Sequence, residues 1–141
     1  MVELKVATGV PNQPTGWLGT ELPKVVMARL QNYIESAKKN PVSHNCNLAG
    51  NITKSLLMED KDDWFFQTVL IPLINKFKEC YPTYVSNISI FTEDAPFCLQ
   101  KFWVNFQKET EFNPFHNHGG IFSFVIWVKI PTDWREQHAL P

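Results

Sequence analysis

The chain has 141 residues, of which 44% are hydrophobic and 19% are charged, and its formal net charge at pH 7 is −1. This length predicts one domain with a core of normal size. Because its basic residues are scattered and balanced by acidic ones, the composition excludes a basic surface for nucleic acid or an anionic membrane.

The cysteines and the N-terminus indicate the compartment. The three cysteines (Cys46, Cys80 and Cys98) form no CxxC pair, which disfavours a disulfide framework and a zinc ribbon and favours a reducing compartment. The first residues lack the layout of a signal peptide, and every apolar run is far shorter than the roughly 20 residues that span a bilayer. We therefore expect a soluble cytoplasmic protein with no membrane partner.

The N-terminal part of the chain predicts one strand and one helix. Residues 2–8 alternate as a short edge strand, and residues 9–19 are predicted to form a loop. Apolar residues then recur at helical spacing over residues 22–39. Thr20 is the expected N-cap of this helix, and Pro23 lies in its first turn.

A second helix is expected after a polar, irregular segment at residues 42–53. Residues 60–63 supply acidic side chains at its start, where the helix dipole favours them. Pro72 lies within its apolar pattern and should kink it, and Tyr81-Pro82 should end it.

The last third of the chain predicts strands. Residues 85–92, 97–107 and 121–130 have strand character and are separated by turn-prone segments at 93–96 and 113–114. Helices followed by strands predict the α+β class, with the helices packed on one face of an antiparallel sheet.

Strand alternation distinguishes two faces on these strands. Trp103 and Asn105 share one face of residues 97–107, and Trp127 and Lys129 share one face of residues 121–130. A face that mixes tryptophan with polar groups can line a small-molecule cavity, or it can be an ordinary half-exposed sheet face. The sequence leaves both readings open.

His116 and His118 are the residues that point to chemistry. In an extended chain, residues i and i+2 project to the same side about 6.5–7 Å apart, so the two imidazoles can converge on one ion. Neutral imidazole is the commonest metal ligand. Gly119 and Gly120 follow at once and are expected where something approaches the backbone closely. The pair predicts a metal site, although His-x-His also occurs in plain loops.

Such a site needs a third protein ligand, and the sequence does not select one. His44 lies in the polar segment and is expected at the surface. The candidates are His138, His44, Glu109, Glu111, Asp133 and Glu136.

The predicted strand at residues 121–130 is followed by a turn at 131–133 and no returning strand. An apolar sheet edge is normally covered. We therefore expect either an incomplete fold at the C-terminus or an edge covered by a partner, such as a second copy of the chain.

Several segments together resemble a known family. The segments at 102–107, 111–118, 123–127 and 130–131, with 47–52 upstream, contain a W-x-N … H-x-H … S-x-x-x-W pattern. This pattern resembles the 2-oxoglutarate/Fe(II)-dependent oxygenases of marine phages and bacteria, in the prolyl-hydroxylase-like superfamily. The resemblance covers about residues 97–136.

The resemblance implies a double-stranded β-helix (jelly roll) flanked by N-terminal helices, with an Fe(II) site that couples oxidation of 2-oxoglutarate to oxygenation of a substrate. His116 corresponds to the first metal ligand, and His118 stands where the family has a carboxylate. This departure leaves the site with one more positive charge, although imidazole suits iron. The candidate contacts to 2-oxoglutarate are Lys129, Trp127, Asn105 and Trp103, and Lys129 can equally be a snorkelling surface lysine.

The resemblance also implies that residues 1–141 are a single domain, the N-terminal part of a longer oxygenase, located in the host cytoplasm if a phage encodes it. Two alternatives remain. One is a cupin-like jelly roll that binds Zn, Ni or Mn, or that has lost its metal. The other is an assembly protein of a phage particle that associates through its aromatic face.

Overall fold

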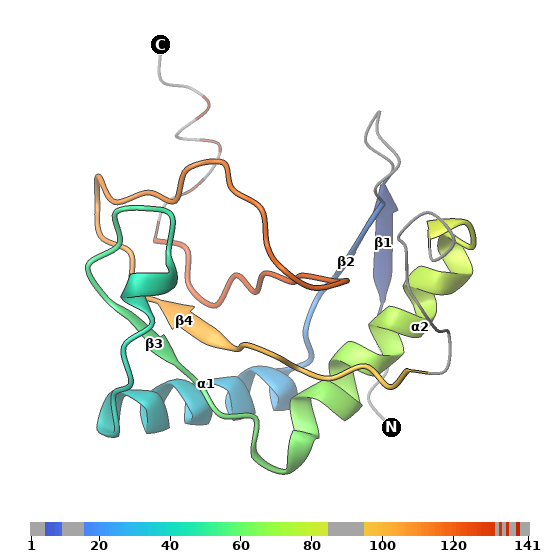
Figure 1. Ribbon diagram of the computed structural model, residues 1–141, viewed down its shortest axis with the longest axis horizontal. Helices are drawn as coiled ribbons and strands as arrows, with labels where there is room; N and C mark the ends of the chain where they lie inside the picture. Colours follow the sequence, from blue (N-terminus) through green and yellow to red (C-terminus); the bar gives the residue numbers. More distant parts are fainter. Residues whose placement is uncertain are drawn as a thin grey trace.

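The structure is a computed structural model that describes residues 5–9, 16–84, 95–131, 133, 135 and 138 (Figure 1). The predicted strand at residues 85–92 lies outside these ranges. The described elements combine helices with small antiparallel sheets, which confirms the α+β class. In chain order they are β1 (Val6–Gly9), β2 (Trp17–Thr20), α1 (Lys24–Lys39), η1 (Asn45–Asn47), β3 (Ser55–Leu57), η2 (Lys61–Asp63), η3 (Phe66–Leu70), α2 (Ile71–Cys80) and β4 (Trp103–Asn105).

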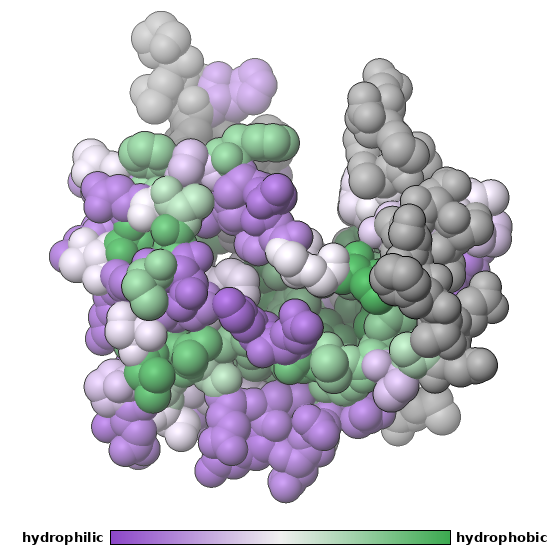
Figure 2. Space-filling model, viewed as in Figure 1, coloured by the Kyte–Doolittle hydropathy of each residue, from purple (hydrophilic) through white to green (hydrophobic). Residues whose placement is uncertain are grey.

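Helix α1 forms where the apolar spacing predicts it, but it begins later than expected. The Pro23 carbonyl accepts hydrogen bonds from the backbone N–H groups of Val26 (2.9 Å) and Met27 (3.0 Å), so Pro23 occupies the N-cap position. Thr20 belongs to β2, and its prediction as the N-cap was wrong. Hydrophilic side chains gather over the outer side of α1 (Figure 2). Its buried stripe comprises Val26, Leu30, Tyr33, Ile34 and Ala37.

The second helical segment contains a π-helical turn, η3, directly before α2. The backbone N–H of Ile71 donates to the carbonyl of Phe66, five residues earlier. Pro72 has no N–H to offer the carbonyl of Thr68, so the regular four-residue pattern is interrupted there. The disturbance expected at Pro72 therefore takes the form of a widened turn, and the helix continues to Cys80.

Asp60 joins the start of this segment to α1. Its carboxylate accepts hydrogen bonds from the backbone N–H groups of Phe65 (2.8 Å) and Phe66 (2.7 Å). These N–H groups belong to the first turn, where a helix has no partner of its own to offer. The Tyr33 hydroxyl donates to the same carboxylate at 3.0 Å. The expected acidic helix start is thus confirmed at Asp60, where it also links two helices.

Strands β1 and β2 form an antiparallel pair with Val6 opposite Thr20 and Gly9 opposite Trp17. The prediction of a loop over residues 9–19 was therefore wrong at Gly9 and from Trp17 onward. The Tyr81 hydroxyl lies 2.9 Å from the carbonyl of Gly9 and 3.0 Å from that of Trp17. Tertiary contacts of this kind, which local composition does not reveal, stabilise the pair.

Strands β3 and β4 form a second antiparallel pair, with Ser55 opposite Asn105 and Leu57 opposite Trp103. The sequence did not predict β3. It predicted a strand over residues 97–107, but the strand is limited to Trp103–Asn105 because β3, its described partner, is equally short.

Residues 121–130 do not form the predicted strand within the described structure. Within the described ranges they pair with no other segment through backbone hydrogen bonds, and a strand requires such a partner. Alternation survives in part, because Phe122, Ile126 and Val128 are partly buried while Val125 and Trp127 are exposed. On the apolar face that these three share, Phe124 and Ile130 are exposed. The jelly roll itself remains a proposal.

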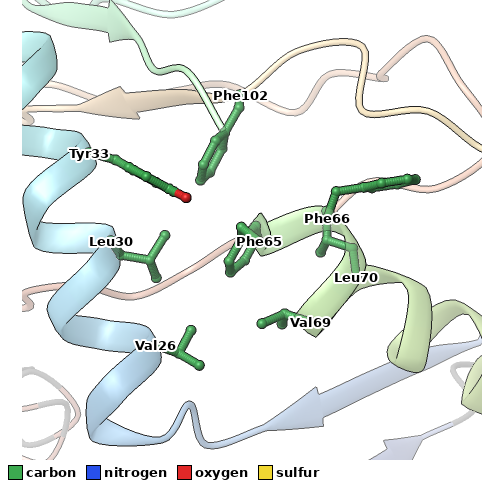
Figure 3. Packing of buried hydrophobic residues seen from close by; sticks show 8 residues of the cluster. All are labelled: Val26, Leu30, Tyr33, Phe65, Phe66, Val69, Leu70 and Phe102. Carbon is green, nitrogen blue, oxygen red and sulfur yellow. The ribbon is translucent and has the colours of Figure 1, made fainter. Parts of the chain in front are cut away.

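The main core lies between α1, the second helical segment and the chain that leads into β4 (Figure 3). Phe65 is only 1% exposed, and its ring stacks on Phe102 with centroids 5.3 Å apart. Figure 3 shows the α1 side chains facing this aromatic pair across the core. The cluster comprises Val26, Leu30, Tyr33, Phe65, Phe66, Val69, Leu70 and Phe102.

Within the described ranges, no helix combines the length and the apolar character that crossing a membrane requires.

Candidate functional site

The loop that contains the two histidines is anchored to the segment before β3. The backbone N–H of Asn51 donates to the carbonyl of Phe112 at 3.0 Å. A Cβ atom added at Gly50 would lie 2.6 Å from the Cα of Asn113. Real Cβ atoms do not approach backbone this closely, so only glycine allows these two segments of the chain to meet here. These two contacts therefore fix the backbone at residues 112–113, directly before the histidines.

The structure brings His116 and His118 together. Their ring centroids are 4.5 Å apart, and the rings are steeply inclined at 71°. With metal–nitrogen bonds of about 2.1 Å, the centres of two imidazoles on one ion are about 4.5–5.3 Å apart. The observed separation falls at the lower end of this range, so the pair is spaced as two ligands of one ion would be.

The ring of His116 is oriented by the backbone. Its Nδ1 lies 2.7 Å from the carbonyl oxygen of Pro114, which requires the proton on Nδ1. The Nε2 atom then has a free lone pair, and the Asn113 amide nitrogen is 3.4 Å from it. Histidines that bind metals commonly donate their other N–H to a carbonyl in this way. His116 is thus set in the tautomer that a metal ligand needs.

Trp103 links the histidine pair to a third imidazole. Its ring centroid is 6.0 Å from that of His118 and 4.9 Å from that of His44. His44 is only 3% exposed, so its prediction as a surface residue was wrong. Burial lowers the pKa of His44, and the positive charge of Lys101 lowers it further, so both favour the neutral ring. His44 is buried because Trp103, the first residue of β4, covers its ring.

The four residues proposed to contact 2-oxoglutarate are not all in one place. Trp103 lies beside His118, and Asn105 follows two residues later in β4, where its side-chain oxygen accepts a hydrogen bond from Ser55 Oγ at 2.8 Å. Trp127 is 75% exposed and Lys129 is also exposed. Within the described structure, neither side chain makes a hydrogen bond or a ring contact to the histidines, and the face that they share is open to solvent.

The candidates for a third ligand do not converge on the histidine pair. Within the described residues, no group of three His, Cys, Asp or Glu side chains could hold a metal ion. Asp133 accepts a hydrogen bond from the backbone of Arg135, and Glu111 is bonded to Thr53. Glu136 lies outside the described residues. His138 and Glu109 are exposed, and His44 packs on Trp103.

The two glycines after His118 have different roles from the one expected. A Cβ atom at Gly119 would meet nothing within 4 Å, and at Gly120 it would only reach Phe122 O at 3.9 Å. No described part of the chain makes the expected close approach to either glycine. Gly120 has a φ of 105°, a conformation that side chains disfavour, so it serves the turn. Gly50, some 70 positions upstream, supplies the close approach.

Glu111 forms a second anchor of the histidine loop. Its carboxylate accepts hydrogen bonds from the hydroxyl and the backbone N–H of Thr53 and from the N–H of Lys108. The Thr53 hydroxyl, followed by the Lys108 N–H, lowers the pKa of Glu111 below its usual value of 4.5. A lowered pKa in the folded state means that the ionised group stabilises the fold above pH 4.5 and loses this effect as the pH falls through the folded-state value.

We expect Glu111→Gln to lower the urea midpoint of unfolding at pH 7, and this difference from the wild type to shrink as the pH is lowered past 4.5. Urea titrations at neutral and acidic pH measure both effects. Glu109→Gln, an exposed neighbour, is the control and should leave the midpoint unchanged. A difference that stays constant with pH would contradict this role.

Sequence reasoning missed Gly50, Asn113 and the burial of His44. Only contacts between distant segments reveal Gly50 and His44. Asn113 had a local signal, since it lies three residues before His116 and directly before Pro114, which restricts its backbone to extended conformations.

The comparisons with known proteins add no relative: no protein-family model, curated protein or solved structure matches this chain.

Proposed function

We propose that this chain is a 2-oxoglutarate- and Fe(II)-dependent oxygenase of jelly-roll lineage, with His116 and His118 as metal ligands. The single observation that supports this most is the imidazole pair, with ring centroids 4.5 Å apart and His116 held by the Pro114 carbonyl in the tautomer that frees Nε2. These donors fit Fe(II), for which imidazole is a common ligand. The iron, when bound, supplies the oxygen-activating chemistry.

The donors present also explain why 2-oxoglutarate should bind. Two neutral imidazoles leave the 2+ charge of the ion uncompensated by protein, and an anionic co-ligand then gains from binding beside it. Trp103 would exclude water from one side of His118, on which it packs with centroids 6.0 Å apart. Asn105 in the same strand and, from residues 121–130, Trp127 and Lys129 are the proposed contacts to the co-substrate.

The experiment is an anaerobic calorimetric titration of the purified chain with Fe(II), with and without 2-oxoglutarate, beside the His116→Ala/His118→Ala double variant. We expect binding that tightens with 2-oxoglutarate and weakens at least about 100-fold in the double variant, since both imidazole ligands are removed. Asn117→Ala, an exposed residue between the two histidines, is the matched control. Binding that the double variant retains would overturn the proposal.

A metal-binding jelly roll without oxygenase activity is the second candidate. It is favoured by one observation, that the described residues bring no His, Cys, Asp or Glu side chain to the pair as a third ligand. Titrations with Zn(II), Ni(II) and Mn(II) distinguish the two. Tight binding of these ions with no effect of 2-oxoglutarate, and no succinate formed with Fe(II) and O₂, would favour the module over the oxygenase.

A further inference from the structure

Asn113 contains a buried polar atom without a partner. Its side-chain Oδ1 is inaccessible to solvent and makes no hydrogen bond, the one such atom among the described residues. Leaving a buried acceptor unpaired typically costs about 1–3 kcal/mol. Oδ1 lies on the side of Gly50, where an added Cβ would be 2.6 Å from it, whereas the amide nitrogen of the same side chain is the atom near His116.

The geometry between Asn113 and His116 suits a shared ion better than a hydrogen bond. The amide nitrogen lies 3.4 Å from His116 Nε2, beyond the usual range of about 2.7–3.2 Å for an N–H donor. Two donors that each lie about 2.1 Å from one tetrahedral ion are about 3.4 Å apart. A half-turn of the amide exchanges its nitrogen and oxygen without changing its shape, so the nitrogen takes the place of the unpaired oxygen beside Gly50 and Oδ1 faces His116 Nε2. Two acceptor lone pairs that face each other repel, and a cation between them turns this repulsion into attraction.

The backbone at this position is well suited to hold a ligand. The Asn51–Phe112 hydrogen bond and the close contact with Gly50 fix the chain on one side of Asn113. Pro114 restricts it on the other, and the Pro114 carbonyl orients His116. One short segment thus presents an amide oxygen and an imidazole nitrogen from a supported turn, as preorganised metal sites do.

We propose that Asn113 is the third protein ligand of the metal, through Oδ1, and that the binding motif is Asn113-x-x-His116-x-His118. This inference rests on the proposed function, since it completes the site that the two histidines begin. All three ligands are then neutral. The ion keeps its full 2+ charge, and the site favours an anionic co-ligand such as 2-oxoglutarate over a neutral one.

The test compares four variants of the full chain: Asn113→Ala, Asn113→Leu, Asn113→Asp and the matched control Asn117→Ala. The probes are Fe(II) under anaerobic conditions, for affinity, and Co(II), whose visible absorption reports the number and type of its ligands. Circular dichroism first establishes that each apo variant is folded. Asn113→Leu keeps the branched shape of the side chain without its polar atoms, so it decides the question if the alanine variant does not fold.

We expect Asn113→Ala and Asn113→Leu to weaken Fe(II) binding about tenfold or more and to change the Co(II) absorption. Asn113→Asp should bind at least as tightly as the wild type, because it replaces the amide oxygen with a carboxylate oxygen. If Asn113 acted only as a hydrogen-bond donor to His116 Nε2, that hydrogen bond would compete with the metal for the same lone pair. The leucine variant would then bind Fe(II) at least as tightly as the wild type, and its Co(II) absorption would match the wild type.

The outcomes separate the two proposals. If the wild type binds metal through its histidines and Asn113→Leu binds within twofold of it, the third-ligand assignment is wrong and the proposed function stands. If the wild type does not bind, or if the double histidine variant binds equally well, the proposed function fails and the assignment fails with it.

Discussion

Gly50→Ala is expected to lower the free energy of unfolding by about 1–3 kcal/mol and to weaken Fe(II) binding about tenfold, whereas Gly119→Ala changes neither. The added Cβ at Gly50 would lie 2.6 Å from both the Cα and the Oδ1 of Asn113. Backbone and a buried amide must move to relieve this overlap. Because Asn113 leads directly into the histidine pair, the displacement reaches the proposed ligands.

Gly119→Ala is a close control because it changes the same residue type on the other side of the pair. A Cβ there would meet no atom within 4 Å. Urea unfolding measures the stability of both variants, and calorimetric titration with Fe(II) measures their affinity. Equal effects of the two substitutions, or a Gly50→Ala variant with wild-type affinity, would show that the contact with residues 112–113 does not position the site.

The features that could be predicted from the sequence depend on local patterns. The apolar spacing over residues 22–39 predicted α1 because the spacing depends only on the residues of the helix itself and not on the segments that pack against it. Pro72 predicted a disturbed helix, since a missing N–H has the same consequence in any fold. Likewise, two side chains separated by one residue project to the same side of an extended chain, and His116 and His118 meet.

The features that were missed depend on distant partners. Residues 17–19 were expected to form a loop, yet they pair with β1, and His44 was expected at the surface but is covered by Trp103. A close approach of backbone was expected at Gly119, but in the described structure it occurs at Gly50. The difference arises because Gly50 meets residues 112–113, which are remote in the sequence. Strand 121–130 was predicted from correct alternation, but a strand also requires a neighbour for its backbone.

Side-chain packing holds residues 121–130 in the described structure. Phe65, an aromatic residue of the main core, therefore also supports this segment. Phe124 packs against Phe65 and Phe102, with ring centroids 5.9 Å and 5.8 Å apart. Phe122 packs similarly on Phe77, at 5.4 Å. Removing Phe65 would therefore open the main core and release Phe124 at the same time.

We expect Phe65→Ala to lower the free energy of unfolding by about 3–5 kcal/mol, a large part of the stability of a domain of this size. Phe115→Ala should change it by less than about 0.5 kcal/mol, because that ring is fully exposed in the histidine loop. Urea unfolding of both variants measures the contrast. If the two substitutions had similar effects, the stacked Phe65–Phe102 pair would not be the centre of the core, and the packing of residues 121–130 would need another origin.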